Sequence, residues 1–270
     1  MKVLLAAVVL VASAMVPARA QTRAPGEIVL TGDSSVSAEM RLEHPVRLRC
    51  CVLFGDDSGG RMVFRIIGME VETSGTFAGF AIERVRDGRI MKGAVRVPAM
   101  DLDDGTVPAH ASFGRARRLP PGDYRIHLLT DGPSTVRIEA EGAPDDLRLT
   151  RPRPSSVSAS LVTLATESGP QKVQDRVPIE VRAGATVVLM SKTEGDYAQA
   201  HYFGHCLTAP GGQCSSQGDY EYWVSPSSGG GGGVKADPVE GLDPGRYDAV
   251  FTAGSAGLPQ GSYGFVLVVG

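Results

Sequence analysis

Three short landmarks occur twice in this chain, in the same order and at nearly the same separation. The second copies follow the first by 121, 120 and 123 residues. The paired segments are Ser34–Ala38 with Ser155–Ala159, Gly75–Ala78 with Gly195–Ala198, and Leu119–Tyr124 with Leu242–Tyr247. Each match is short, but three matches within three residues of one register indicate a module present in tandem. The sequence therefore predicts two homologous domains related by internal duplication.

The local pattern after the N-terminal segment is that of short antiparallel strands. Runs of alternating apolar and polar residues are broken by Gly, Pro, Asp and Ser, and long helical periodicity is absent. In the run 135–140, alternation places Val136, Ile138 and Ala140 inward and Arg137 and Glu139 toward water. We therefore expect an all-β protein of two tandem antiparallel β-sandwich domains with Greek-key or jelly-roll-like topology.

Two turn signals mark these strands. Asp87-Gly88 separates the strand-like runs 80–86 and 89–91, which predicts a β-hairpin. In each module a Pro-Gly pair precedes a tyrosine by two residues, at Tyr124 and Tyr247. This resembles the tyrosine corner of Greek-key sandwiches, in which the phenol bonds a backbone group upstream; an ordinary turn followed by a strand tyrosine is the alternative. Either reading makes both tyrosines structural.

The N-terminus predicts a cleavable export signal. A basic start at Lys2 precedes an apolar run from Val3 to Val16, and Ala18-Arg19-Ala20 forms an A-x-A cleavage site. The apolar run is too short for a membrane-spanning helix, which needs about 20 residues. We expect residues 1–20 to be the signal peptide and the mature chain to be secreted or periplasmic, without an integral membrane segment.

The predicted domain boundaries follow from composition. Residues 21–148 form the first sandwich, 149–156 a proline-containing connector and 157–270 the second sandwich. Loss of Lys2 and Arg19 with the signal changes the net charge from −3 to −5. That balance argues against a nucleic-acid partner and identifies no ligand. A partner at the cell envelope or outside the cell remains open.

Four cysteines in an exported chain favour disulfides over a reduced metal site. Cys206 and Cys214 enclose a short Gly/Pro-containing loop and form the simplest local bridge. Cys50 and Cys51 would then form a vicinal disulfide or remain as two thiols on opposite strand faces. A crossed pairing of Cys50 and Cys51 with Cys206 and Cys214 would clamp the modules together.

Two clusters in the second module are candidate sites. His201 and His205 lie about 13 Å apart on a regular strand, too far to share a metal without a bend. They are weak metal candidates, and structural histidines are the alternative. Tyr220, Tyr222 and Trp223 are weak ligand-binding candidates, although alternation sends Trp223 to the face opposite the tyrosines.

Two charged segments complete the candidates. Asp101–Gly105 resembles part of a calcium loop, but glycine stands where the third ligand belongs, which favours a turn. Seven arginines between 84 and 118 could bind an acidic surface or form a solvated sheet face. They are Arg84, Arg86, Arg89, Arg96, Arg115, Arg117 and Arg118.

Chemistry-bearing motifs are absent from the sequence. It contains no nucleophile elbow, P-loop, dinucleotide loop or HExxH, so we assign no catalytic residue and expect no cofactor. The sequence favours an exported non-enzymatic protein with a binding or structural role. The alternatives are a carbohydrate- or other ligand-binding module and a metal-assisted hydrolase centred on His201 and His205.

Overall fold

The computed structural model describes eleven stretches of the chain. They are residues 19–22, 26–50, 52–57, 62–100, 109–141, 153–154, 157–165, 174–192, 203–214, 234–253 and 262–270. Within these stretches the regular structure is antiparallel strands and one 3-10 turn, Pro98–Met100. The expected all-β, antiparallel class is confirmed.

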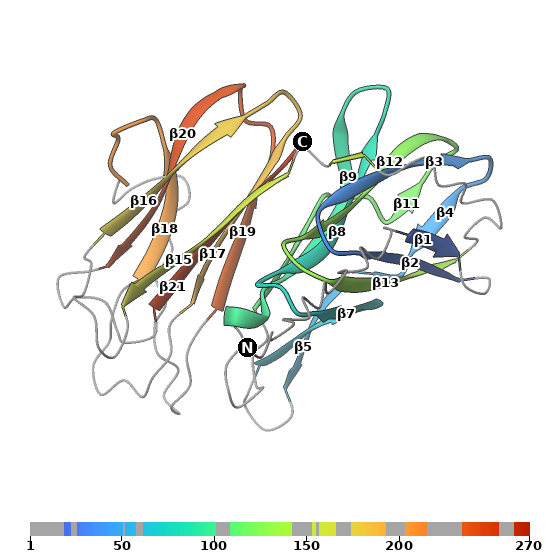
Figure 1. Ribbon diagram of the computed structural model, residues 1–270, viewed down its shortest axis with the longest axis horizontal. Helices are drawn as coiled ribbons and strands as arrows, with labels where there is room; N and C mark the ends of the chain where they lie inside the picture. Colours follow the sequence, from blue (N-terminus) through green and yellow to red (C-terminus); the bar gives the residue numbers. More distant parts are fainter. Residues whose placement is uncertain are drawn as a thin grey trace, which may run out of the picture.

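The half before residue 155 contains two main sheets (Figure 1). The outer sheet has the strand order β1 (Arg19–Thr22), β2 (Glu27–Gly32), β13 (Ser134–Glu141), β4 (Val46–Leu48) and β11 (Arg118–Leu119), with β7 (Met69–Thr73) also paired to β13. The inner sheet has the order β10 (His110–Phe113), β9 (Arg89–Arg96), β8 (Ala78–Arg84), β12 (Gly122–Thr130), β3 (Val36–Leu42) and β14 (Arg153–Pro154). A separate hairpin pairs β5 (Val52–Asp57) with β6 (Met62–Ile67).

The half from residue 157 onward also contains two sheets. The inner sheet has the order β15 (Ser158–Ala165), β21 (Ser262–Val269), β17 (Thr186–Lys192) and β19 (Val234–Val239). The outer sheet has the order β16 (Gln174–Val181), β20 (Gly245–Ala253) and β18 (Phe203–Thr208).

The two halves share a strand-pairing pattern. In the first, β2 and β4 pair with β13 while β3 and β8 pair with β12; in the second, β15 and β17 pair with β21 while β16 and β18 pair with β20. The Pro-Gly-Tyr landmarks therefore begin corresponding strands, β12 and β20. The Ser-rich landmarks do not, because they lead into β3 and β15, and the counterpart of β15 is β2. The landmark at Gly195–Ala198 lies outside the described residues.

Three hydrophobic cores separate the four main sheets. The first lies inside the first sandwich, around Phe80 and Ile126, and another lies inside the second sandwich, around Leu189 and Phe251. Between the two inner sheets lies a further core, which we call the joint core. Its fully buried members include Ala81, Val95, Leu129, Val188, Met190, Phe265, Leu267 and Val269.

The sequence pattern of a strand indicates whether it is buried on one face or on both. Outer strand β13 alternates, with Val136, Ile138 and Ala140 buried as predicted and Glu139 exposed. Inner strand β17 is buried at all seven positions. A strand covered on both faces needs apolar side chains at successive positions, whereas a half-buried strand alternates. The apolar runs of β17 and β21 thus specify that their sheet has a partner on each side.

The predicted turns appear with one difference. β8 and β9 form the expected hairpin, and Gly88 has a positive φ of 68°. Arg84 pairs with Arg89, so the connection has four residues, 85–88, rather than the two of a tight Asp-Gly turn. At the N-terminus, β1 pairs with β2 across the expected cleavage point between Ala20 and Gln21. Cleavage there would divide β1.

Candidate functional site

A histidine bridges the two sheets of the second sandwich. His205 lies on β18 and is fully buried. Its Nδ1 lies 2.7 Å from Oγ of Ser191 on β17, and its Nε2 lies 3.0 Å from Oδ2 of Asp237 on β19. One ring therefore ties outer strand β18 to two neighbouring strands of the inner sheet.

The protonation pattern of this cluster follows from the acceptor. A carboxylate only accepts, so Nε2 of His205 donates to Asp237; in the neutral ring Nδ1 then accepts from the Ser191 hydroxyl. Serine, histidine and aspartate in line are the components of a nucleophilic triad. Ser191, however, is fully buried, with no exposed surface. The hydroxyl is thus enclosed in the core, and the contacts of His205 connect the two sheets.

Strand alternation explains how Ser191 reaches His205. Ser191 shares the face of Leu189, which packs in the core of the second sandwich, whereas its neighbour Lys192 points to the joint-core side. Lys192 is also fully buried, and its Nζ lies 5.9 Å from the centre of the Tyr263 ring. The two polar residues that end β17 thus point to opposite faces of the inner sheet.

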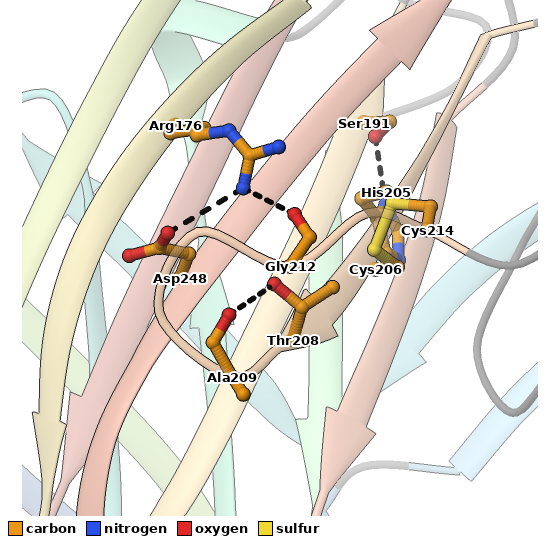
Figure 2. Close-up of a disulfide and its surroundings, with 9 residues drawn as sticks. All are labelled: Arg176, Ser191, His205, Cys206, Thr208, Ala209, Gly212, Cys214 and Asp248. Atoms are coloured by element: carbon orange, nitrogen blue, oxygen red, sulfur yellow. Dashed lines mark hydrogen bonds and ion pairs between the residues drawn. A yellow bond between two sulfur atoms is a disulfide. The ribbon is translucent and has the colours of Figure 1, made fainter.

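The predicted local disulfide is confirmed. Cys206 and Cys214 are bonded, with their Cα atoms 5.8 Å apart, and Figure 2 shows the bridge beside the His205 cluster. The crossed pairing with Cys50 and Cys51 is therefore wrong. Cys50 is also disulfide-bonded, and its partner lies outside the described residues.

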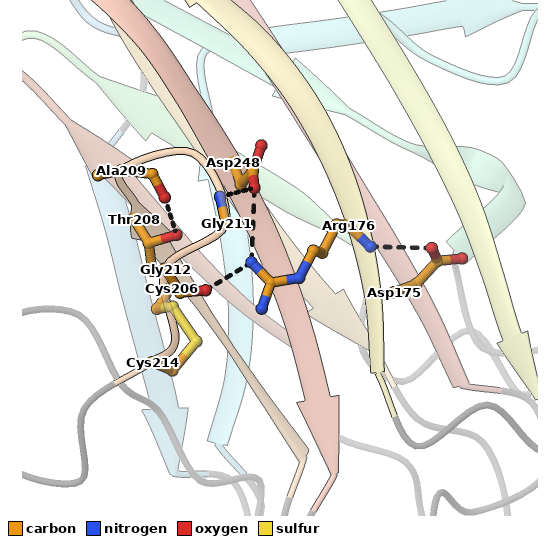
Figure 3. A network of polar contacts seen from close by, with 9 residues as sticks. All are labelled: Asp175, Arg176, Cys206, Thr208, Ala209, Gly211, Gly212, Cys214 and Asp248. Carbon is orange, nitrogen blue, oxygen red and sulfur yellow. Dashed lines mark hydrogen bonds and ion pairs between the residues drawn. A yellow bond between two sulfur atoms is a disulfide. The ribbon is translucent and has the colours of Figure 1, made fainter.

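An ion pair anchors the loop that the disulfide closes. Arg176 of β16 donates to the carbonyl oxygen of Gly212 at 2.5 Å and lies 3.4 Å from Oδ2 of Asp248 on β20. The same carboxylate accepts from the amide of Gly211 at 2.8 Å (Figure 3). In the outer sheet, Val250 of β20 lies opposite Cys206 of β18, and its side chain is on the outward face of the sheet. Val250 is nevertheless fully buried. The loop is thus held over the outer sheet by covalent and polar contacts.

A second polar cluster lies in the first half, at the rim of the joint core. Glu83 of β8 accepts from Nη1 of Arg125 at 3.0 Å and lies 2.9 Å from Nε2 of His127, both on β12. Burial raises the pKa of the Glu83 carboxyl, but the hydrogen bond with His127 and the charge of Arg125 outweigh it. The pKa therefore lies below its ordinary value of 4.5. Glu83 is held ionised between two donors.

The corner tyrosines make the bonds that define the motif. Tyr124 Oη donates to the carbonyl oxygen of Pro120 at 2.7 Å, and Tyr247 Oη donates to that of Asp243 at 2.9 Å. Each bond spans four residues. Tyr124 is 1% exposed, whereas Tyr247 is half-buried. Each hydroxyl therefore closes a turn.

The remaining predicted site residues fall outside the described part of the chain. These are His201, Tyr220, Tyr222, Trp223 and the segment Asp101–Gly105. Where residues are described, no group of three or more His, Cys, Asp or Glu side chains could hold a metal ion. Nor does this part contain a helix with the length and apolar character needed to cross a bilayer.

Sequence reasoning missed the partners of His205. Ser191 and Asp237 are far from His205 in sequence and carry no motif. One signal was present: Ser191 and Lys192 are polar residues ending a strand that is otherwise apolar from Val187 to Met190. A polar side chain in a strand buried on both faces requires a partner.

Comparisons with known proteins add no family. A scan against protein-family models finds no match, and a search of the curated proteins finds none.

Proposed function

We propose that this chain is an exported, non-enzymatic β-sandwich protein with a binding or structural role at the cell envelope or outside the cell. The observation that carries this proposal is the engagement of His205. Its two ring nitrogens contact Ser191 and Asp237 in a fully buried position. The described cluster that most resembles catalytic machinery thus contributes to holding sheets together.

Export is supported by the covalent chemistry of the chain. Cys206–Cys214 and the disulfide at Cys50 suit an oxidising compartment. The test is cell fractionation in the native host, followed by N-terminal sequencing and thiol alkylation. We expect a protein outside the cytoplasm that begins at Gln21 and whose cysteines resist alkylation without reductant. A full-length, cytoplasmic protein with reactive thiols contradicts the proposal.

A second candidate is a carbohydrate- or other ligand-binding module that uses Tyr220, Tyr222 and Trp223. Strand register supports it, because the described ends of five strands meet at one end of the second sandwich. Lys192 pairs with Val234 and Tyr263, and Phe203 pairs with Ala253. The segment that carries the three aromatic residues joins the described chain there, at Val234. A change in tryptophan fluorescence on titration with oligosaccharides would favour this candidate.

A metal-assisted hydrolase centred on His201 and His205 is the least supported alternative. To bind a metal, His205 would have to give up its contact with Ser191 or Asp237 in a buried environment. The test is elemental analysis of the purified protein. Stoichiometric zinc that is lost in a folded His205→Ala variant would show a metal site at His205 and would favour the hydrolase alternative.

We infer further that the two halves arose by duplication. The matching pairings around β12 with β13 and around β20 with β21, and a tyrosine corner at the start of β12 and β20, support this inference. An experimental structure tests it by superposition. The set β3-β12-β8 should overlay on β16-β20-β18 together with the facing sheets, whereas opposite connection handedness would contradict common descent.

A further inference from the structure

The first half contains a strand that is interrupted. β4 and β7 both pair antiparallel with β13, β4 near the end of β13 and β7 along the rest of it. Between the two, the carbonyl oxygen of Glu139 accepts from the amide of Arg49 at 3.0 Å, and the amide of Glu139 donates to the carbonyl oxygen of Gly68 at 2.8 Å. β4 and β7 are thus two parts of one line of pairing, and residues 50–67 are inserted between them.

The second half has no such interruption in its corresponding strand. That strand, β17, pairs with β21 continuously from Thr186 to Lys192. In the first half the insertion carries the hairpin β5–β6, and in the described part of the chain these two strands pair only with each other. A single two-stranded hairpin is marginally stable on its own. The position of this hairpin therefore depends on how its base is held at the interruption.

The two ends of the insertion are packed against each other. Gly68 has a positive φ of 71°, and a Cβ atom at this position would lie 3.0 Å from the carbonyl carbon and oxygen of Arg49 and 3.1 Å from Cα of Cys50. Cys50 is 3% exposed and packs in the core of the first sandwich. A change in the bonding of Cys50 would therefore act at the point where the inserted hairpin leaves the sheet.

The bonding partner of Cys50 follows from the number of cysteines. The chain has four, at positions 50, 51, 206 and 214. Cys206 and Cys214 are bonded to each other, and Cys50 is also disulfide-bonded. Cys51, which lies outside the described residues, is the one cysteine of the sequence that remains. Within one chain, the second bridge therefore joins two consecutive residues.

Consecutive residues are poorly placed for a disulfide. Their Cα atoms are at most about 3.8 Å apart, whereas the Cα atoms of bridged residues usually lie about 4.4–6.8 Å apart. The Cα atoms of Cys206 and Cys214, at 5.8 Å, fall within the usual range. A bridge forced outside that range is more easily reduced. The bond at Cys50 should therefore be the first of the two to open under reducing conditions.

We propose that Cys50 and Cys51 form a vicinal disulfide that acts as a redox-sensitive clamp at the base of the inserted hairpin. A protein dithiol reduces it: one thiolate of the dithiol attacks one sulfur, and the second thiol resolves the mixed disulfide. Two electrons and two protons pass to the chain as the dithiol becomes a disulfide. The backbone beside Gly68 then loses its covalent constraint. This inference goes beyond the proposed binding or structural role, and formation of the bridge in the cell rests on the proposed export.

The first test locates the bridge and measures how easily it is reduced. Trypsin cleaves after Arg49 and Arg61 and after Lys192 and Lys235, so each pair of cysteines falls in its own peptide. Purified oxidised protein is equilibrated in graded mixtures of reduced and oxidised dithiothreitol, alkylated, digested and analysed by mass spectrometry. We expect an internal disulfide in peptide 50–61. It should open at a potential at least about 30 mV less reducing than the bridge of the other peptide, a tenfold difference in equilibrium constant.

The second test measures whether the bond holds the strand ends together. In a Cys206→Ser/Cys214→Ser background the bond at Cys50 is the remaining disulfide, so dithiothreitol acts on it alone. We expect the amides of Arg49 and Glu139, which bond across the interruption, to exchange with solvent on the order of tenfold faster after reduction. Amides of the uninterrupted strand β17 should exchange at the same rate in both states.

A variant without the bond provides the matched control. Cys50→Ala/Cys51→Ala in the same background should show the fast exchange whether or not dithiothreitol is present. If this variant does not fold, the comparison of the oxidised and reduced parent still tests the clamp. If the background itself does not fold, the unaltered chain is measured at a potential that reduces peptide 50–61 alone.

Four results overturn the proposal. They are free thiols in peptide 50–61 of the oxidised protein, a dimer linked through that peptide, reduction of its bridge only at the same or a more reducing potential than the other, and unchanged exchange at Arg49 and Glu139 on reduction. Because both tests use purified protein, their failure leaves the fractionation test of export unaffected.

Discussion

The ring of Phe77 lies 5.5 Å from the ring of Phe265, tilted by 54°, although the residues belong to different halves of the chain. Phe77 immediately precedes inner strand β8, and Phe265 lies on inner strand β21. Both are buried in the joint core. The two sandwiches therefore share a hydrophobic core, and their stabilities should be coupled.

Replacing Phe265 with alanine should destabilise the whole protein by about 3–5 kcal/mol, the usual cost of removing a buried phenylalanine. Phe77→Ala should have a smaller effect, because Phe77 retains 5% exposure whereas Phe265 has none. Denaturant unfolding measures both. In a double-mutant cycle the coupling energy should be about 0.5–1.5 kcal/mol, the contribution of an aromatic pair.

The exposed Val85 supplies a control for this cycle, since it is 44% exposed. Val85→Ala should change the free energy of unfolding by less than about 0.5 kcal/mol. Strict additivity of the two phenylalanine substitutions would show that the rings do not interact.

The two corner tyrosines predict a graded pair of effects. Tyr124→Phe should cost about 1 kcal/mol of stability, because the carbonyl of Pro120 loses its donor in a buried corner. Tyr247→Phe should cost less, because Tyr247 is half-buried and water can replace the hydroxyl. Thermal melting of both variants is the measurement. Equal melting temperatures for Tyr124→Phe and the unaltered chain would show that the hydrogen bond between Tyr124 and Pro120 does not stabilise the fold.

Removal of the Ser191 hydroxyl should leave Nδ1 of His205 without its donor in the core. We expect Ser191→Ala to lower the free energy of unfolding by about 1–3 kcal/mol, the cost of an unsatisfied buried polar group. Ser158→Ala, at an exposed position of β15, is the matched control and should be nearly neutral. If Ser191→Ala proved as stable as the control, the contact between Ser191 and His205 would contribute nothing to stability.

Acid should weaken the fold partly through Glu83. Its folded-state pKa lies below the ordinary 4.5, so the stabilisation is present above that pH and is lost as pH falls through the lower folded value. Glu83→Gln should therefore flatten the decline of stability below about pH 4.5, measured by urea unfolding at several pH values. Glu180→Gln, at an exposed site, should keep the slope of the unaltered chain. An unchanged slope in Glu83→Gln would show that His127 and Arg125 do not hold the carboxyl ionised.

The conformation of the loop between Cys206 and Cys214 should depend on both the disulfide and the polar contacts of Asp248. Cys206→Ser/Cys214→Ser opens a loop with a sequence separation of 8. Loop-closure entropy predicts a loss of roughly 2.5 kcal/mol for a loop of that length. Adding Asp248→Asn to this double variant should increase proteolysis between Cys206 and Cys214. The Gly211 amide and the Arg176 guanidinium would both lose the carboxylate that they contact. Protease resistance equal to that of the disulfide variant would show that the ion pair does not hold the loop.

Local patterns in the sequence were enough for the fold class, the inward residues of β13, the β8–β9 hairpin and the Cys206–Cys214 bridge. Each depends on residues close together in the chain. The Ser-rich repeat misled, because a short Ser/Ala string also begins the non-corresponding strands β3 and β15. The Pro-Gly-Tyr landmarks, by contrast, begin the corresponding strands β12 and β20, and each tyrosine hydroxyl bonds a carbonyl four residues upstream.

The joint core and the polar clusters could not be predicted in this way. Phe77 meets Phe265, and Ser191 meets His205 and Asp237, only after strands distant in sequence have stacked into layers. The uninterrupted apolar runs of β17 and β21 did indicate strands covered on both faces. They could not indicate that the covering layer on one side is the inner sheet of the other sandwich.

Native-state hydrogen exchange in increasing denaturant tests the sharing of the joint core most directly. Amides of β12 in one half and β20 in the other should converge on one opening free energy, and Phe265→Ala should lower both by the same amount. Separate plateaus, with Phe265→Ala affecting β20 alone, would mean that the sandwiches unfold independently and that the joint core does not unite them.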